Sequence, residues 1–456
     1  MKKKSLGLLS LIAINIIAVD NLRSLPFSAE YGFSLIFFYL VAALCFFIPV
    51  GLISAELATA YPMRGGIYIW IKEAFGNRCA FFIIYLQWIY NVVWYPTIMG
   101  LVAATIFYLF NPSLADHQLA MFLLVQVLFW SATLFNWFGM KVSSFISHLG
   151  AIFGTVLPMV LISALGLFWL YEGRPIPIPY QFLPNITELS NLSFLVAILF
   201  GLIGLELAAS HADEVKNPSR DFPLAIFISS IIILGTLILA SLAIAFVIPS
   251  KELNVLTGLI QAYERFFAAF HLEWMSPIVQ ILIIIGGLSS VAAWILGPSK
   301  GLFMAASYGN IPPFFTKLNQ HGVPTHILLT QGCIYTLLSS LFIFMPSIAS
   351  SYWILSAMTS QLALIVYIAL FAAAIVLRYK APHQPRPYKI PGGNIGILLL
   401  GGFGIAASLI GILVGFIPPS QIPVGNVYLF ETILIGGILL LSGIPFLIYR
   451  SSKNER

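Results

Sequence analysis

The stretch LGLLSLIAINIIAVDNLRSLPF, residues 6–27, decides what kind of fold this chain adopts. Fourteen mostly apolar residues run from Leu6 to Val19, the four residues from Asp20 to Arg23 interrupt them, and apolar character returns at Leu25. At about 1.5 Å per residue, fourteen helical residues cover about 21 Å, whereas the hydrocarbon core of a bilayer is ~30 Å thick. The segment therefore crosses a membrane only if its interruption lies inside the bilayer. Polar, non-helical backbone at that depth is stable only where it lines a protected cavity, so the break predicts a discontinuous helix that faces a ligand.

The composition places the whole chain in a membrane. Of its 456 residues, 60% are hydrophobic and only 8% are charged, whereas about a quarter of the residues of a soluble domain are charged. The net charge is +6, but the basic residues fall in short loops on one side of the predicted spans, so we expect no nucleic-acid partner. The three cysteines, Cys45, Cys79 and Cys333, lie in apolar surroundings and suggest neither disulfides nor zinc. We expect no metal and no cofactor.

Apolar segments predict about twelve membrane-spanning helices in one transmembrane domain, residues 1–456. They lie near residues 6–29, 33–58, 79–109, 118–138, 145–171, 193–212, 223–248, 275–299, 327–345, 352–378, 395–417 and 427–449. An even number of spans puts both termini on one side. If that side is the cytoplasm, eighteen Lys and Arg residues lie inside and only Arg174, Lys251 and Arg265 lie outside, as the positive-inside rule requires. We expect an all-α protein of the plasma membrane, or of the inner membrane in a Gram-negative cell.

A second interruption occurs in the sixth predicted span, where residues 201–206 read GLIGLE. Two glycines weaken the helix there, and an acid stands in what would otherwise be hydrocarbon. Transporters with inverted repeats carry one broken helix at the corresponding place in each half. The sequence therefore predicts a five-plus-five inverted repeat with discontinuous helices one and six. The repeats cover about 6–171 and 193–378, and two extra helices follow at about 395–449.

Several sequence blocks resemble the amino acid-polyamine-organocation superfamily. They are FIPVG at 47–51 with AELAT at 55–59, the glycine-rich segment 65–76, DEVKNPSRD at 213–221, WILGPSKG at 294–301 and RPYKIPGG at 386–393. Within that superfamily the sequence of these blocks resembles that of the glutamate/γ-aminobutyrate antiporters. The resemblance implies alternating access and the exchange or uptake of amino acids or related amines. The expected partners are therefore a small-molecule substrate and the surrounding lipid bilayer.

The resemblance also implies a substrate site at the two breaks, flanked by the third and eighth spans. Relatives usually have a Gly-Ser-Gly type break whose backbone N–H groups hold the substrate carboxylate. Here Asp20 would repel that carboxylate unless Arg23, three residues on, neutralises it. The candidate substrate-binding residues are Val19, Asp20, Asn21, Arg23, Ser24, Tyr90, Asn91, Phe200, Gly201, Leu202, Gly204, Glu206, Ser290 and Trp294.

Arg23 is the one Lys or Arg within the predicted spans and away from their ends, and it has two interpretations. It either pairs with Asp20 or Glu206, or it holds a carboxylate of the substrate. Glu206 itself is either functional or a structural acid, and burial requires it to be protonated or bonded. Leu202 stands where many relatives have an aromatic gate, and Ser290 where the glutamate/γ-aminobutyrate antiporters have an acid. The sequence therefore does not identify glutamate as the substrate.

Charged residues at or after the cytoplasmic ends of the second, sixth and eighth spans are candidates for an inner gate held by ion pairs, and the alternative is that they are solvated loop residues. These candidates are Glu56, Arg64, Glu214, Lys216, Arg220 and Lys300. Some proton-coupled relatives have a lysine in the fifth span where motif spacing puts Gly154 here, which favours antiport. A proton-coupled amino acid or polyamine symporter is the alternative, and the oligomeric state stays open. The seven histidines are scattered and form no catalytic grouping, so we expect no enzyme.

Overall fold

The computed structural model describes residues 6–62, 65–138, 150, 152–184, 189–209, 215–307, 309 and 311–454. In this part of the chain the regular structure is helical, and β pairing is limited to the isolated bridges Leu6–Val215 and Leu318–Pro324. The α-helices are α1 Leu8–Val19, α2 Leu25–Ala29, α3 Leu35–Ala42, α4 Ile48–Ala60, α5 Ile67–Phe75, α6 Asn77–Phe110, α7 Gln118–Trp137, α9 Leu157–Tyr171, α10 Leu195–Gly201, α11 Glu206–Ala209, α12 Pro218–Val247, α13 Gly258–Phe270, α14 Ser276–Ser307, α15 Thr325–Ser339, α16 Leu341–Phe344, α17 Ile348–Lys380, α18 Gly393–Val414 and α19 Val427–Asn454. Single π-helical turns are η2 Ala43–Phe47 and η4 Ile152–Val156, and 3₁₀ turns are η1 Gly32–Ser34, η3 Pro112–Asp116, η5 Leu189–Leu192, η7 Glu273–Met275 and η8 Pro313–Thr316.

Ten of the helical segments are long and apolar enough to cross a membrane. The first and sixth predicted spans are the exceptions, because they appear as the shorter apolar helices Leu8–Val19 and Ser190–Gly201. The all-helical membrane architecture is thus confirmed for the described residues. The two segments that fall short are those in which the sequence predicts a break.

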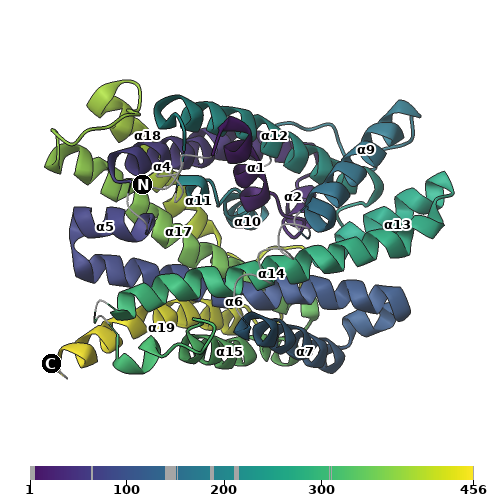
Figure 1. Ribbon diagram of the computed structural model, residues 1–456. Helices are drawn as coiled ribbons and strands as arrows, with labels where there is room; N and C mark the ends of the chain where they lie inside the picture. Colours follow the sequence, from purple (N-terminus) through teal and green to yellow (C-terminus); the bar gives the residue numbers. More distant parts are fainter. Residues whose placement is uncertain are drawn as a thin grey trace.

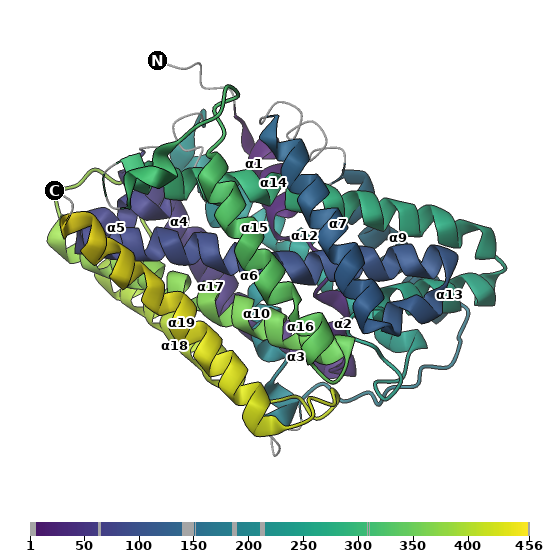
Figure 2. The same cartoon turned by 90° about the horizontal axis from the view of Figure 1, so that it is seen from below.

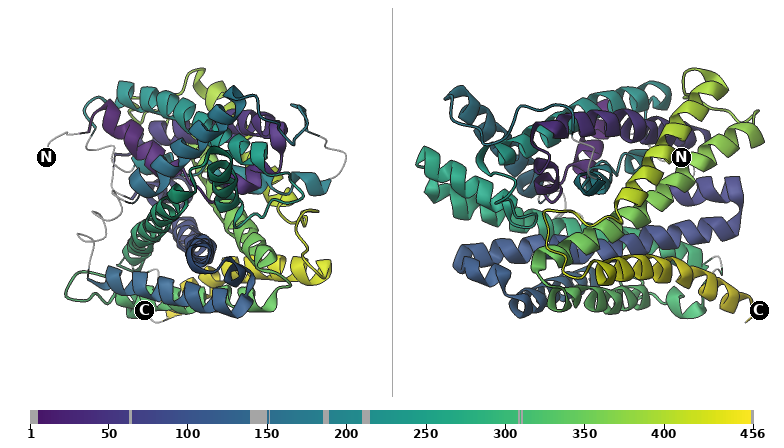
Figure 3. Two further views of the ribbon diagram at one scale, coloured as in Figure 1. Left: turned by 90° about the vertical axis from the view of Figure 1, so that its right-hand side faces the viewer. Right: turned by 180° about the vertical axis from the view of Figure 1, so that it is seen from behind.

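The long helices run side to side across Figure 1, and the left view of Figure 3 looks along many of them. α6 packs against α14 and α17, and α12 packs against α1, α4 and α9. The short helices α2, α10 and α11 lie between these groups in Figure 1, and Figure 2 shows α2 and α10 from below. α18 and α19 both pack against α17. The two interrupted segments therefore lie inside the bundle, where their free backbone groups are shielded from lipid.

Contacts between distant segments show which helix ends share one side of the bundle. The backbone N–H of Lys216, just before α12, donates to the carbonyl of Leu6, just before α1. At the end of α17, Lys380 donates to the carbonyl of Glu73 on α5, and Gln384 donates to that of Ala60 at the end of α4. These contacts agree with helices that alternate in direction along the chain.

Candidate functional site

The two helix breaks touch each other. The Asn21 amide of the first break donates to the carbonyl of Gly201 in the second, at 3.4 Å. A Cβ at Gly204 would lie 2.8 Å from the carbonyl oxygen of Ala18, and one at Gly201 would lie 3.2 Å from the Ser24 hydroxyl. The breaks, which are 180 residues apart at Asn21 and Gly201, thus form one structural unit.

The first break follows from its own residues. α1 ends at Val19, and Asp20 turns to extended backbone with ψ 125° while its N–H makes the last helical bond, to Ile16. The Asn21 side chain accepts from the Ser24 N–H at 3.0 Å and donates to the Val19 carbonyl at 3.0 Å, so it satisfies groups that the interrupted helix leaves free. A proline in the first turn of α2 then restarts the helix with a preset φ.

The second break depends on a glycine. α10 ends at Gly201, α11 begins at Glu206, and Gly204 between them has φ +133°, a conformation that side-chain-bearing residues rarely adopt. The absence of a Cβ also allows the close approach of Gly204 to the backbone of α1. The polar and glycine residues that revealed the breaks in the sequence are therefore those that produce them.

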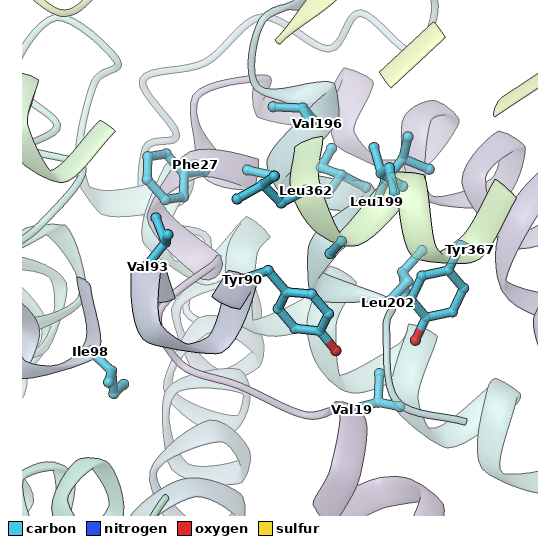
Figure 4. Packing of buried hydrophobic residues seen from close by; sticks show 14 of the residues in the cluster. Val19, Phe27, Tyr90, Val93, Ile98, Val196, Leu199, Leu202, Leu362 and Tyr367 are labelled. Carbon is cyan, nitrogen blue, oxygen red and sulfur yellow. The ribbon is translucent and has the colours of Figure 1, made fainter. Parts of the chain in front are cut away.

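A cavity of about 110 Å³ lies where the breaks meet α6, η4 and α14. A single small organic molecule needs a volume of this order. Nine of the fourteen candidate substrate-binding residues line it: Val19, Asp20, Asn21, Arg23, Tyr90, Asn91, Phe200, Ser290 and Trp294. Figure 4 shows Val19 of the first break and Tyr90 of α6 in this region, with the buried apolar residues behind them. Whether these residues bind substrate stays a prediction, but the structure brings them together.

Five candidate residues do not line this cavity: Ser24, Gly201, Leu202, Gly204 and Glu206. A break has two faces, and these residues lie on the face that packs into the bundle. Leu202 is fully buried among apolar side chains, near Leu199 and Tyr367 in Figure 4. Glu206, the first residue of α11, is buried beside the Tyr367 hydroxyl. One of its carboxylate oxygens has no hydrogen-bond partner among the described residues.

Arg23 is buried, and the groups around it are neutral. Its Nη1 donates to the Ser356 hydroxyl at 2.9 Å and to the Thr97 hydroxyl at 3.4 Å. Its guanidinium lies 5.1 Å from the centre of the Phe200 ring, close enough for a cation–π interaction. Tyr352 lies beside it and donates to its backbone carbonyl at 3.4 Å. Within the described ranges Arg23 forms no ion pair, so the predicted pairing with Asp20 or Glu206 is not observed in this structure.

Asp20 also lacks a charged partner in the described part of the chain. Both of its carboxylate oxygens accept from the Thr236 hydroxyl of α12, at 3.3 and 3.4 Å. The same hydroxyl lies 3.0 Å from the carbonyls of Ile232 and Ile233, one turn earlier in α12. A hydroxyl has a single proton, and in helices it commonly bonds the carbonyl four residues back. The hydrogen bond to Asp20 is therefore a shared one.

Sequence reasoning missed several parts of this site. Thr97 and Ser356, which hold Arg23, are single hydroxyls in apolar spans, where Ser and Thr usually bond their own helix. Both do so here as well, to Trp94 and Tyr352. The cavity wall also includes one threonine and several apolar and glycine residues without a distinguishing pattern: Thr155, Ile98, Leu101, Ile203, Ile283, Gly286 and Gly287. No signal in the sequence separates them from ordinary packing residues.

The fifth and eighth spans meet at the cavity through glycines. A Cβ at Gly154 of η4 would lie 2.2 Å from the backbone of Gly286 in α14, and one at Gly150 would lie 2.0 Å from the Ser289 hydroxyl. Gly154 stands where motif spacing puts a lysine in some proton-coupled relatives. In this structure the position has no room for any side chain.

The structure rules out the solvated-loop alternative for Glu56, because this residue is 2% exposed. That it belongs to an inner gate stays a prediction. One carboxylate oxygen bonds Arg378 at the end of α17 and accepts from the Ile390 N–H at 2.8 Å, and the other lies 3.2 Å from Arg386 Nε. The RPYKIPGG segment folds back onto α4 and brings Arg386 and the Ile390 N–H with it, whereas Arg378 comes from α17. We call Glu56, Arg378 and Arg386 the Glu56 cluster.

Of the other gate candidates, Arg64 and Glu214 lie outside the described residues. Lys216 and Arg220 have exposed side chains, and the contact of Lys216 with Leu6 runs through the backbone. Lys300 lies within α14, between the eighth span and the loop that follows it.

Comparison with known proteins places the chain among transporters. It is 53% identical over 455 residues to an uncharacterised transporter of Legionella pneumophila, an alignment that covers 99% of this chain and 98% of that protein. It is 30% identical over 457 residues to a glutamate/gamma-aminobutyrate antiporter of Lactococcus lactis subsp. cremoris, covering 98% of this chain and 91% of the antiporter. It is 27% identical over 377 residues to a probable agmatine/putrescine antiporter of Lactococcus lactis subsp. lactis, covering 81% and 78%.

The amino acid permease family matches residues 6–439, nearly the whole chain. This match confirms the resemblance seen in the motifs, and the ten long apolar helices agree with it. The chain therefore belongs to the amino acid permease family and is a multi-pass integral membrane protein.

Proposed function

We propose that this protein carries amino acids or related amines across the membrane by alternating access, with the cavity between the two helix breaks as its substrate site. The observation that carries the proposal is Arg23, a buried cation that lines the cavity and meets only neutral groups among the described residues. Buried charges in membrane proteins are costly and are usually paired or functional. A substrate carboxylate would supply the missing negative charge through charge-assisted, often bidentate, hydrogen bonds.

The architecture that goes with this function is a five-plus-five inverted repeat of about twelve spans. The repeats cover about 6–171 and 193–378, and the extra helices about 395–449. The contact between the breaks of the first and sixth spans supports this assignment, because repeat-built transporters place both broken helices around one site. Alternating access then moves the broken helices relative to the helices that surround them.

We place the protein in the plasma membrane, which is the inner membrane in Gram-negative bacteria. Both of its termini then lie in the cytoplasm. The excess of Lys and Arg in the loops of that side supports the orientation. Single cysteines that replace Asp116 or Arg174, in a variant of the protein without other accessible cysteines, test this orientation in intact cells. Both positions are expected to react with an impermeant reagent added outside. Labelling of position 116 only after the membrane is opened would overturn the orientation.

Antiport is the transport mode that we favour. The Lactococcus relatives named above are antiporters by name, and the packing of Gly154 on Gly286 leaves no space for a proton-carrying lysine at that position. A proton-coupled amino acid or polyamine symporter is the second candidate. Glu206 favours it, because this buried acid has one carboxylate oxygen without a partner in the described ranges.

Counterflow in proteoliposomes tests the function. Vesicles loaded with unlabelled amino acid are expected to accumulate labelled amino acid, and empty vesicles are expected to take up very little. Uptake into empty vesicles that rises with an inward proton gradient would favour symport. A channel would equilibrate label along its gradient whatever the vesicles contain, and an enzyme would change the label chemically. Absence of uptake under all of these conditions, with every amino acid and polyamine tried, would reject the proposal.

A further inference from the structure

We infer that the cavity selects zwitterions: Asp20 binds the ammonium group of the substrate while Arg23 binds its carboxylate. The inference rests on the proposed function, because it specifies the substrate class of the same cavity. It also discriminates between two kinds of compound that the proposed function leaves open. Amino acids carry both groups, whereas polyamines carry no carboxylate.

The first step is that the two charges lie in one cavity without neutralising each other. Asp20 and Arg23 both line it, and no ion pair joins them. Asp20 is 6% exposed and Arg23 is 2% exposed, so water offers neither of them much compensation. A buried charge that is not paired is costly. The net charge of the two residues is zero, but neither of them is in contact with a counter-charge within the residues that the structure describes.

The second step concerns what already surrounds each charge. Neutral hydroxyl groups of Thr97 and Ser356 hold the Arg23 guanidinium from α6 and α17 and orient it, but they bring no negative charge. Among the described residues, the Asp20 carboxylate receives only the shared proton of Thr236. An Asp–Arg contact would have satisfied both residues without a ligand, and the extended backbone at Asp20 keeps their side chains apart. Each charge is therefore positioned by polar neighbours and still lacks a counter-charge among the described residues.

The third step is the chemistry of the ligand that satisfies both charges. A molecule with one ammonium and one carboxylate group brings a counter-charge to each. A diamine satisfies Asp20 but places its second cation in the same small cavity as Arg23. A dicarboxylate satisfies Arg23 but brings an anion towards Asp20. Like charges at short range in a site of low dielectric constant repel strongly, so the cavity discriminates against both.

Matched ligand series test the inference on the purified full-length protein in detergent. Thermal shift is measured with the common amino acids and with three four-carbon compounds: 4-aminobutyrate, putrescine and succinate. For each amino acid that raises the Tm, its decarboxylated amine and its deaminated acid are measured as well. Ligands that bind the folded state raise the Tm by mass action. We expect both analogues of each such amino acid to bind roughly 30-fold more weakly or worse, the loss typical when one partner of a buried charge pair is removed.

Two variants then assign the groups. Asp20→Asn is expected to weaken binding of the amino acid and to improve binding of the deaminated acid relative to that of the amino acid. Arg23→Gln is expected to shift the preference in the opposite direction, towards the decarboxylated amine. A purely structural role for either residue would change overall stability without reversing this ratio. Asp116→Asn and Lys317→Gln, which remove exposed charges away from the cavity, are the matched controls.

The outcomes separate this inference from the proposed function. Counterflow of putrescine as fast as that of any amino acid would overturn the zwitterion inference and leave transport itself intact. Unchanged selectivity in folded Asp20→Asn protein would also overturn it, because the Asp20 carboxylate would then contribute nothing to recognition of an ammonium group. If the variants fail to fold, the analogue series on the unmodified protein still decides. Failure of counterflow with every compound would reject both proposals together.

Discussion

The Glu56 cluster at the end of α4 buries one acid against two arginines, whereas the cavity between the helix breaks buries Asp20 and Arg23 apart from each other. In the cluster, both oxygens of Glu56 are bonded, and a backbone N–H adds a further hydrogen bond. In the cavity, Arg23 meets two hydroxyl groups and the face of the Phe200 ring, and Asp20 meets the Thr236 hydroxyl. Ion pairs therefore offset the cost of desolvating the charges in the Glu56 cluster. In the cavity, no ion pair among the described residues offsets this cost.

The difference separates architecture from binding. A buried ion pair with its partners in place fixes two chain segments together, and removing one partner leaves the others uncompensated. The Glu56 cluster joins α4, the end of α17 and the segment before α18, which are far apart in the sequence. Charges that are held in position but not paired are suited to a ligand that brings the counter-charge. The following predictions test this contrast, beginning with the largest expected effect.

Glu56→Gln is expected to destabilise the protein by about 3–5 kcal/mol, because it leaves two buried arginines without a counter-charge. Folded yield and Tm in detergent measure the effect. Asp20→Asn, which removes a buried acid that has no paired cation, is expected to leave the Tm unchanged or to raise it. Glu73→Gln on the exposed side of α5 is the control. If Glu56→Gln proved as stable as Glu73→Gln, the distinction between the two regions would be lost.

Gly204→Leu is expected to abolish transport while folded protein remains in the membrane. It changes the cavity region without altering a charge. The φ of +133° costs a residue with a side chain about 1–3 kcal/mol, and the new Cβ would meet the Ala18 carbonyl. Counterflow and size-exclusion profiles measure the two properties. The matched pair Gly204→Ala and Gly201→Ala sharpens the result, because a Cβ at Gly201 would come no closer than 3.2 Å to any atom, and that atom is the movable Ser24 hydroxyl. Equal transport by both alanine variants would contradict this account of the break.

Gly154→Ala is expected to cost about 1–3 kcal/mol, the usual range for adding a methyl group to a tightly packed contact. Its Cβ would lie 2.2 Å from the backbone of Gly286, so the two helices have to separate. The measurement is the Tm relative to Gly436→Ala, whose added Cβ would meet nothing within 4 Å. Identical melting of the two variants would show that the fifth and eighth spans are not in this close contact.

The smallest effect is expected at a neutral polar pair. The Asn15 amide on α1 donates to the Ser229 hydroxyl on α12 at 3.0 Å, both residues being buried. A double-mutant cycle with Asn15→Ala and Ser229→Ala is expected to give a coupling of roughly 0.6 kcal/mol, typical of hydrogen bonds between membrane helices. A coupling as large as the loss at Glu56 would mean that burial alone, without charge, explains the stability of the cluster.

The helical architecture and the position of both breaks were predictable because they depend on local properties. An apolar segment that is too short for the bilayer, or one that contains glycines and an acid, cannot form an uninterrupted lipid-facing helix. α1 ends at Val19 and α10 at Gly201, as the sequence predicts. Nine of the fourteen candidate site residues line the cavity because they lie at the breaks or on spans that flank them. Whether the other five line the cavity depended on which face of each break turns towards it. That orientation follows from how the breaks pack against the surrounding helices.

The sequence by itself thus determined where the long apolar segments lie, where two of them break, and that Asp20, Arg23 and Glu206 are charges within apolar spans. Only the tertiary structure decided how those charges are compensated. The rule that residues three apart contact each other holds within a helix, and Asp20 leaves the helix with ψ 125°, so the expected Asp20–Arg23 pair does not form. The partners of Glu56 lie 322 or more residues away in the sequence, and those of Arg23 lie on α6 and α17. Ion pairing acts over a few ångströms in space, and distances in space between separate helices are set by packing, which spacing along a chain does not contain.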